Sequence, residues 1–280
     1  MKLALGTVQF GLDYGAFGAG RQVARPEVSA MLDYARIAGI DLLDTARAYG
    51  ESEAVLGKEK AADRFRIVTK CPRLDYAKNP AVELLANFDA SCAALGTNWL
   101  AGYLLHSSRD IELPGVLAAL EQLVADGRVE RFGVSAYGFD EAQALCARYP
   151  LTLVQLPANV LTPWFRNGGL PHTVEVHVRS AFLQGFLLSN PERLPDQFRP
   201  WRDTLDTFRA RAAVRGLTQQ EAALAPLLHS PYIHRVVVGA DNLAQLDELV
   251  FAAGVVCTDL GDFPGVTPEL TDPRYWKNDI

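Results

Sequence analysis

The chain has 280 residues, of which 49% are hydrophobic and 21% are charged, and its formal net charge is −6. These values are typical of a globular protein and exclude a long disordered or fibrous chain. Acidic and basic residues are interspersed, so no basic patch predicts binding to nucleic acid. The longest apolar runs fall short of the roughly 20 residues that a membrane-spanning helix requires, so no membrane span is expected.

The four cysteines, Cys71, Cys92, Cys146 and Cys257, lie far apart in the chain. Their spacing predicts neither a structural zinc site nor a disulfide framework, and we expect no metal. Reduced thiols are typical of a reducing compartment, and the first residues, MKLALGTVQFG, resemble a strand more than a secretory signal. The sequence therefore predicts a cytoplasmic protein, present as a monomer or a weak oligomer.

Short apolar segments predict eight strands along the chain. In order, these are Leu3–Thr7, Asp41–Thr45, Arg66–Lys70, Trp99–His106, Arg131–Ser135, Leu151–Leu156, Val174–Ser180 and Arg235–Gly239. Helical patterns follow most of them: Pro26 to Gly39, a segment beginning near Ser52, Ala81–Leu95, Pro114–Asp126, Phe139–Tyr149, two pieces between Leu205 and His229, and Leu243–Ala253. Pro26 suits a first helical turn, Gly39 a helix end and Ser52 an N-cap.

Apolar strands separated by helices indicate an α/β protein with a parallel sheet covered by helices. Eight such units close a (β/α)8 TIM barrel, which commonly needs about 250 residues, so we expect a single domain over residues 1–280. The irregular stretch from Pro157 to Thr173 replaces a sixth helix and predicts an extra loop over the C-terminal face. The rival, an open doubly wound sheet, needs a phosphate loop whose glycine spacing differs from that between Gly11 and Gly20.

Four ionisable residues, Asp44, Tyr49, Lys70 and His106, lie at or just after the ends of three consecutive strands. In a barrel these ends converge on one mouth. A lysine in an apolar mouth needs a carboxylate, which Asp44 supplies. The ammonium in turn favours the phenolate of a nearby tyrosine, so Tyr49 can act as a general acid. A neutral His106 can orient a carbonyl oxygen, and the set predicts hydride delivery to an aldehyde or ketone.

The segments LALGTVQFG, GIDLLDTARAYGESEAVLG, IVTK, LLHS and GVSAYG resemble the aldo-keto reductase superfamily, in the same order and with similar spacing. The resemblance covers nearly the whole chain. It implies that Asp44, Tyr49, Lys70 and His106 form the catalytic tetrad of that family, with Tyr49 as the acid. It also implies that NADPH or NADH binds in an extended form across the barrel mouth, without a Rossmann fold.

The same resemblance assigns the nicotinamide end of the cofactor site. Ser135 and Gln155 would hold the carboxamide, although Ala136 stands where the family usually has Asn. Arg179 stands where the family usually has an aromatic residue that stacks on the nicotinamide. A planar guanidinium can also stack on a ring. Its positive charge would, however, repel an oxidised nicotinamide. The residues so implied to bind the cofactor are Thr7, Asp44, Ser135, Gln155, Arg179, Ser180, Phe182, Gln184, Gly185, Gly239, Asp241 and Gln245.

The adenosine end of the implied site lacks the usual phosphate clamp. Gly239 and Gln245 stand where many NADPH-using relatives place Lys and Arg, and Asp241 is nearby. We therefore expect the protein to use both cofactors, or at least to tolerate NADH.

The substrate is less well defined than the cofactor. Besides Tyr49 and His106, the aromatic residues expected to line the mouth are Phe10, Tyr14, Trp164 and Phe165. The short tail after Ala253 predicts an open pocket, and a sugar-derived carbonyl is one candidate. Two other functions stay open: a Schiff-base aldolase or lyase that uses Lys70 as nucleophile, and a non-catalytic redox sensor that binds the nicotinamide.

Overall fold

The fold is a closed barrel of eight parallel strands, as predicted from the alternating pattern. The computed structural model describes residues 1–15, 17, 21–257 and 259–276. Each strand pairs with its neighbour in the chain, and the first pairs with the last. The strands are β1 (Leu3–Gly6), β2 (Leu42–Asp44), β3 (Arg66–Cys71), β4 (Leu100–Leu105), β5 (Val129–Ser135), β6 (Leu153–Pro157), β7 (Glu175–Arg179) and β8 (Arg235–Val238).

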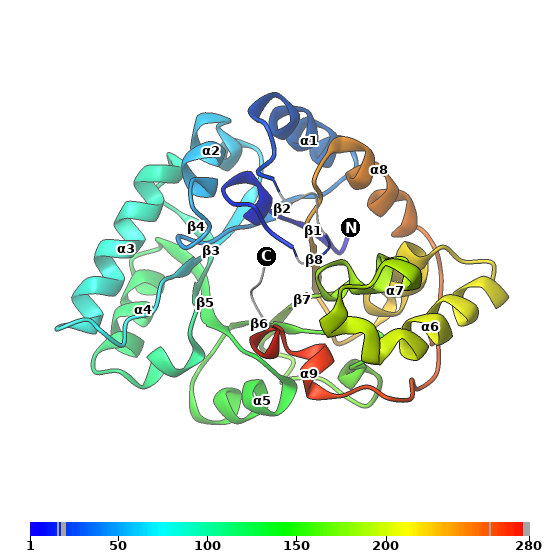
Figure 1. Ribbon diagram of the computed structural model, residues 1–280. Helices are drawn as coiled ribbons and strands as arrows, with labels where there is room; N and C mark the ends of the chain where they lie inside the picture. Colours follow the sequence, from blue (N-terminus) through cyan, green and yellow to red (C-terminus); the bar gives the residue numbers. More distant parts are fainter. Residues whose placement is uncertain (16, 18–20, 258, 277–280) are drawn as a thin grey trace.

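Helices surround the strands on the outside (Figure 1). They are α1 (Arg25–Ile37), α2 (Ser52–Lys58), α3 (Pro80–Leu95), α4 (Val116–Ala125), α5 (Phe139–Arg148), α6 (Arg202–Val214), α7 (Gln219–His229), α8 (Leu243–Ala252) and α9 (Pro268–Thr271). Between β6 and β7 the chain forms only a 3₁₀ turn, Trp164–Arg166, which confirms the predicted excursion in place of a sixth helix. No helix in the described part of the chain is long and apolar enough to cross a bilayer.

The boundaries of α1 follow the predicted signals. Pro26 lies in the first turn, where a missing backbone N–H costs nothing. Gly39 follows the helix with a φ of +86°, and the N–H of Ile40 reaches back to the carbonyl of Ala35 at 2.9 Å. This left-handed position favours glycine because a side chain would be strained there.

Ser52 does not cap α2, and this prediction was wrong. Glu51 precedes the helix, without a capping hydrogen bond from its side chain. The hydroxyl of Ser52 is instead buried, donates to the carbonyl of Thr7 at 2.8 Å and contacts the hydroxyls of Thr7 and Thr45 at 2.9 and 3.0 Å. It therefore ties the loop after β2, which carries Tyr49, to the end of β1.

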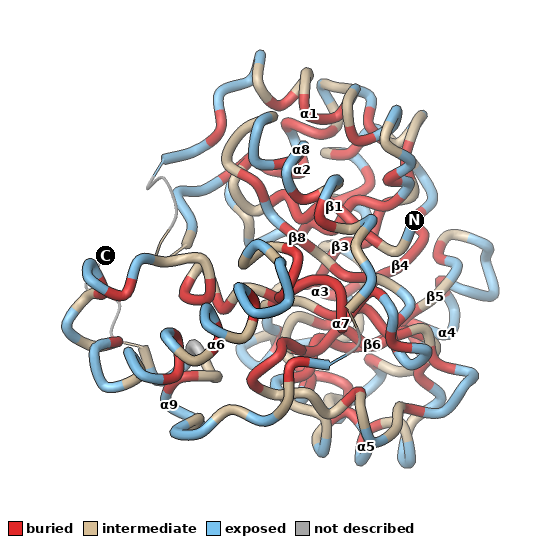
Figure 2. The backbone as a smooth tube through the Cα atoms, turned by 90° about the vertical axis from the view of Figure 1, so that its right-hand side faces the viewer, coloured by how far each residue is buried: buried red, intermediate tan, exposed pale blue. Residues whose placement is uncertain are grey.

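Most strand residues are buried, and exposed residues lie around the outside of the molecule (Figure 2). A small apolar plug of strand residues is separate from the larger core between strands and helices. Leu153, on β6, lies close to two glycines, Gly133 on β5 and Gly102 on β4. A Cβ on Gly133 would lie 1.5 Å from the carbonyl oxygen of Leu153, and one on Gly102 would lie 2.6 Å from its side chain. The plug residues are Ala4, Leu42, Val68, Leu104 and Leu153.

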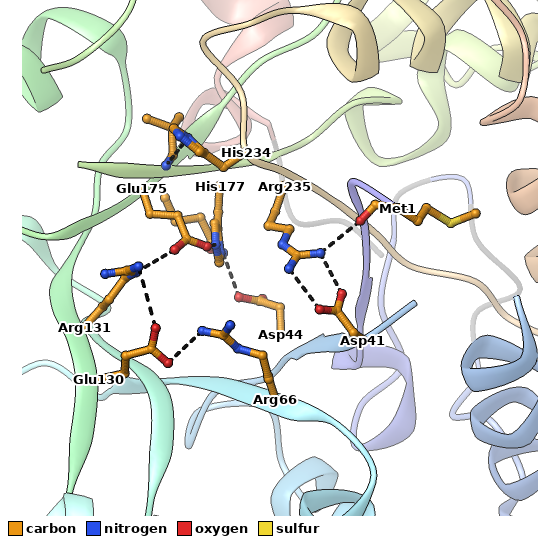
Figure 3. A network of polar contacts seen from close by, with 12 residues as sticks. Met1, Asp41, Asp44, Arg66, Glu130, Arg131, Glu175, His177, His234 and Arg235 are labelled. Carbon is orange, nitrogen blue, oxygen red and sulfur yellow. Dashed lines mark hydrogen bonds and ion pairs between the residues drawn. The ribbon is translucent and has the colours of Figure 1, made fainter. Parts of the chain in front are cut away.

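Charged residues occupy the amino-terminal end of the barrel (Figure 3). Glu175 accepts from Arg131 Nε at 2.6 Å and contacts His177 Nε2 at 2.9 Å, and His177 is only 1% exposed. The hydrogen bond from His177, together with Arg131, outweighs burial and lowers the pKa of Glu175 to about 2. Paired charges therefore link the amino-terminal ends of these strands. The carboxyl ends of the strands remain available for a binding site.

Replacing Glu175 should destabilise the protein in a pH-dependent way. We expect Glu175→Gln to lower the free energy of unfolding by about 2 kcal/mol at neutral pH. The pKa of Glu175 lies near 2 in the folded protein, below its ordinary 4.5. Its contribution to the free energy of unfolding is therefore complete above the ordinary pKa of 4.5 and is lost as the pH falls from there toward 2. Urea denaturation at about pH 7 and about pH 3 measures both effects.

The matched control is Glu112→Gln, because Glu112 forms an ion pair with Arg148 in which both side chains are at least half exposed. Its loss should change the stability by no more than about 0.5 kcal/mol. An equal deficit of Glu175→Gln at both pH values would contradict the assignment.

Candidate active site

A cavity of about 790 Å³ lies at the carboxyl ends of the strands. All twelve residues that the sequence assigned to the cofactor line it: Thr7, Asp44, Ser135, Gln155, Arg179, Ser180, Phe182, Gln184, Gly185, Gly239, Asp241 and Gln245. Tyr49, His106 and Tyr14 line the same cavity. The topology thus brings together residues from the whole length of the chain.

Asp44 lines this cavity and forms a buried ion pair with Lys70 behind it. Lys70 Nζ lies 2.6 Å from Asp44 Oδ1 and donates to the carbonyl of Thr45 at 2.8 Å. The second carboxylate oxygen, Asp44 Oδ2, accepts from Gln155 Nε2 at 2.7 Å. The side chains of Lys70 and Asp44 are 1% and 5% exposed. One carboxylate therefore connects β2, β3 and β6.

The ion pair keeps Lys70 protonated despite its burial. Burial by itself lowers the pKa of a lysine, but the charges of Asp44 and Tyr49 and their hydrogen bonds raise the pKa of Lys70 above its ordinary 10.5. An enclosed, paired ammonium is a poor nucleophile. This argues against Schiff-base chemistry at Lys70.

Tyr49 lies between Lys70 and the open cavity. Lys70 Nζ is 5.1 Å from the centre of the Tyr49 ring, and the charge of Tyr49 helps to raise the pKa of Lys70. The ring of His106 meets the ring of Tyr49 edge to face, with 5.9 Å between centres. Gly11 permits this placement of the loop, because a Cβ there would lie 1.9 Å from the backbone oxygen of Tyr49.

His106 is neutral near pH 7. Burial, followed by the charges of Lys70 and Arg179, lowers the pKa of His106 from 6.5 to about 4. A neutral imidazole can donate one hydrogen bond to a carbonyl oxygen. Tyr49 and His106 therefore present two polar groups to the same part of the cavity.

The loop after β7 has a strained backbone where it borders the cavity. Ser180, Leu183 and Gln184 have φ values of 63°, 49° and 51°, and Gly185 has 102°. Non-glycine residues in this region cost of order 1 kcal/mol or more each, and such strain clusters at ligand-binding segments. A Cβ on Gly185 would lie 2.8 Å from Cβ of Phe17. Residues 16 and 18–20 of the predicted glycine-rich loop fall outside the described residues.

Three aromatic residues predicted to line the mouth do not do so. Phe10 is fully buried in the main core. Trp164 stacks on Phe139 at 4.8 Å and donates its indole N–H to the carbonyl of Pro157 at 3.0 Å. Phe165 is likewise buried, with 4% exposure. These residues do lie in loops, as predicted, but their side chains pack against other protein groups and not into the cavity.

Sequence reasoning missed residues of the cavity wall that come from distant segments. Arg274, near the C-terminus, lies 4.0 Å from the ring centre of Tyr137 and is paired with Asp272 at 2.5 Å. Arg274 and Tyr137 both line the cavity, so the tail contributes to the wall of the pocket. No local pattern marks this contact. The other missed residues include Gln9, Phe17, Arg193 and Glu248.

A profile of the Aldo/keto reductase family matches residues 2–259. The chain belongs to the aldo/keto reductase family. It is 27% identical over 273 residues to the 6-dehydroglucose reductase of Agrobacterium fabrum, in an alignment that covers 88% of each protein.

Two shorter alignments concern oxidoreductases. The chain is 34% identical over 117 residues to oxidoreductase sirO of Leptosphaeria maculans, covering 41% of this chain and 36% of that protein. It is 32% identical over 111 residues to methylglyoxal reductase YeaE of Escherichia coli, covering 38% of each. The chain thus spans little more than a third of the length of these two relatives.

Solved structures share the barrel. The holo form of aldo-keto reductase AKR11C1 from Bacillus halodurans superposes with a TM-score of 0.71 at 20% identity, covering 91% of this chain and 87% of that one. An aldo/keto reductase from Klebsiella pneumoniae, in complex with NADP and acetate, gives 0.67 at 23% identity with the same coverage. At these identities the likeness concerns the fold alone.

Removing Asp44 should cost more stability than removing the whole ion pair. Asp44→Ala leaves a buried ammonium without its carboxylate, which we expect to cost about 3–5 kcal/mol. The double variant Asp44→Ala/Lys70→Met should recover most of this loss, because it removes the unpaired charge as well. Denaturant unfolding of the two variants and the wild type measures the difference.

Asp75→Ala is the control, because Asp75 pairs with Arg73 at 3.7 Å in an exposed position. It should leave the stability within about 0.5 kcal/mol of the wild type. If Asp44→Ala were no less stable than the double variant, the buried pair would not have the role assigned to it.

Proposed function

We propose that this member of the aldo/keto reductase family uses NADPH or NADH to reduce an aldehyde or a ketone, with Tyr49 as the general acid. The observation that carries the proposal is the buried Lys70–Asp44 ion pair directly behind Tyr49. A fixed ammonium stabilises the phenolate that remains after Tyr49 gives up its proton. The neutral His106 beside it supplies the second hydrogen bond to the reacting oxygen.

The cavity fits an extended nicotinamide dinucleotide. Its lining runs from the tetrad to the start of α8, and it contains an unsatisfied buried acceptor, Gln9 Oε1, among the described residues. Gly239 keeps this end free of a side chain, because a Cβ there would lie 2.5 Å from Gln9 Nε2. Ser135 and Gln155 would hold the carboxamide, and residues 180–185 would hold the pyrophosphate. The bound cofactor would supply the hydride.

The side chains of the tetrad then divide the remaining work. Tyr49 donates the proton to the carbonyl oxygen, and His106 holds that oxygen in place. Asp44 keeps Lys70 charged and oriented. The side-chain amide N–H of Gln155 donates to Asp44, and the side-chain carbonyl oxygen of Gln155 stays available to accept a hydrogen bond from a carboxamide.

A small or sugar-derived carbonyl is the substrate class that we propose. The 6-dehydroglucose reductase of A. fabrum and the methylglyoxal reductase of E. coli are named for carbonyl compounds of this kind. We also propose that the protein acts in the cytoplasm, which the four free cysteines support.

Tyr49→Phe tests the proposed acid. The variant lacks the transferable proton but keeps the ring, so we expect kcat to fall by roughly 100-fold or more while the Kd of the reduced cofactor stays nearly unchanged. Turnover on a panel of aldehydes and ketones, together with fluorescence titration of the cofactor, measures both quantities.

Tyr76→Phe serves as the control, because Tyr76 is 88% exposed and lies outside the cavity. Its kcat should equal that of the wild type. A Tyr49→Phe variant with wild-type turnover would show that another group donates the proton.

The cofactor preference follows from the adenosine end of the cavity. Asp241 and Glu248 line it, and Gln245 Oε1 is occupied by the backbone N–H of Asp241 at 2.8 Å. Carboxylates accept hydrogen bonds from ribose hydroxyls but repel a 2′-phosphate. We therefore expect the KM for NADH to lie within about tenfold of the KM for NADPH.

Steady-state kinetics with both cofactors decide this point. Asp241→Asn/Glu248→Gln should lower the KM for NADPH and leave that for NADH nearly the same. A preference of the wild type for NADPH by more than about 100-fold would contradict this expectation.

A further inference from the structure

The guanidinium of Arg179 contacts neutral oxygens in the cavity. It donates to the carbonyl of Ala136 at 3.1 Å and to the hydroxyl of Ser180 at 3.3 Å, and no ion pair joins it to a carboxylate among the described residues. Asp272, the carboxylate whose pKa it helps to lower, is already bound to Arg274. Arg179 therefore brings a positive charge into the cavity that no contacting carboxylate neutralises.

This charge lies beside the reacting centre. Arg179 ends β7, and its contact with Ala136 places the guanidinium one residue beyond Ser135, at the end of β5. Its charge contributes to the lowered pKa of His106. A ring that is held at Ser135 and Gln155 and reacts with a carbonyl at Tyr49 must therefore lie close to this guanidinium.

We propose that Arg179 makes the cavity discriminate between the two oxidation states of the nicotinamide cofactor. This inference rests on the proposed function. The reduced ring is neutral and can stack on the planar face of a guanidinium. The oxidised ring carries a positive charge and is repelled by the same group. The reduced cofactor is therefore bound more tightly, and the oxidised cofactor is released more easily after the reaction.

Direct binding measurements test the proposal without relying on turnover. The dissociation constants of NADH and NAD⁺ are measured by fluorescence titration for the wild type, Arg179→Gln and Arg179→Lys. We expect the wild type to bind NADH at least about tenfold more tightly than NAD⁺. Arg179→Gln should reduce this ratio by fivefold or more, mainly by tightening the binding of NAD⁺. Arg179→Lys keeps the charge and should keep the preference for NADH.

Arg36→Gln is the matched control. It removes the same charge from an exposed position in the last turn of α1, outside the cavity. The ratio of the two dissociation constants should therefore stay at the wild-type value. Arg179→Tyr provides a second neutral variant with a side chain that can stack, and it should bind both forms with the reduced ratio.

Three other results would contradict the proposed role of Arg179 or the proposed function. An unchanged ratio in Arg179→Gln, or an equal loss of affinity for both forms, would show that Arg179 does not sense the charge of the ring. Complete loss of binding in Arg179→Tyr would exclude the stacking role. If the wild type bound neither NADH nor NADPH, the proposed function would fail, and this inference would fail with it.

Discussion

A lysine buried inside a barrel stays charged only when a carboxylate neutralises it. In this protein Asp44 meets that condition for Lys70 with one oxygen and holds Gln155 with the other. The site depends on this arrangement, because it fixes an ammonium behind Tyr49 and joins three strands at the level where the cavity begins. Without Asp44, burial would favour the neutral amine, and the proton transfer that we propose for Tyr49 would lose the charge that supports it.

The two ends of the barrel differ in how their charged residues are used. At the amino-terminal end, Arg131, Glu175 and His177 form paired, enclosed contacts that stabilise the fold. At the carboxyl end, Asp44, Tyr49, His106 and the strained loop after β7 border an open cavity. The apolar plug around Leu153 separates the two sets of charges.

Much of this organisation could be predicted from the sequence because strand periodicity and strand-end residues are local signals. The eight strands and the positions of Asp44 and Lys70 follow from apolar runs that end in an ionisable residue. Side-chain burial within a loop is not a local property, so Phe10 could not be recognised as a core residue. The contact of Arg274 with Tyr137 joins distant segments and leaves no pattern in either.

A crystal structure of the protein with NADH and a slowly reacting ketone tests the central claim most directly. The account predicts that Lys70 stays bound to Asp44, that the Tyr49 hydroxyl faces Lys70, and that the ketone oxygen lies within hydrogen-bonding distance of Tyr49 and His106. A Tyr49 hydroxyl that points away from Lys70, with the ketone oxygen held by other groups, would contradict it.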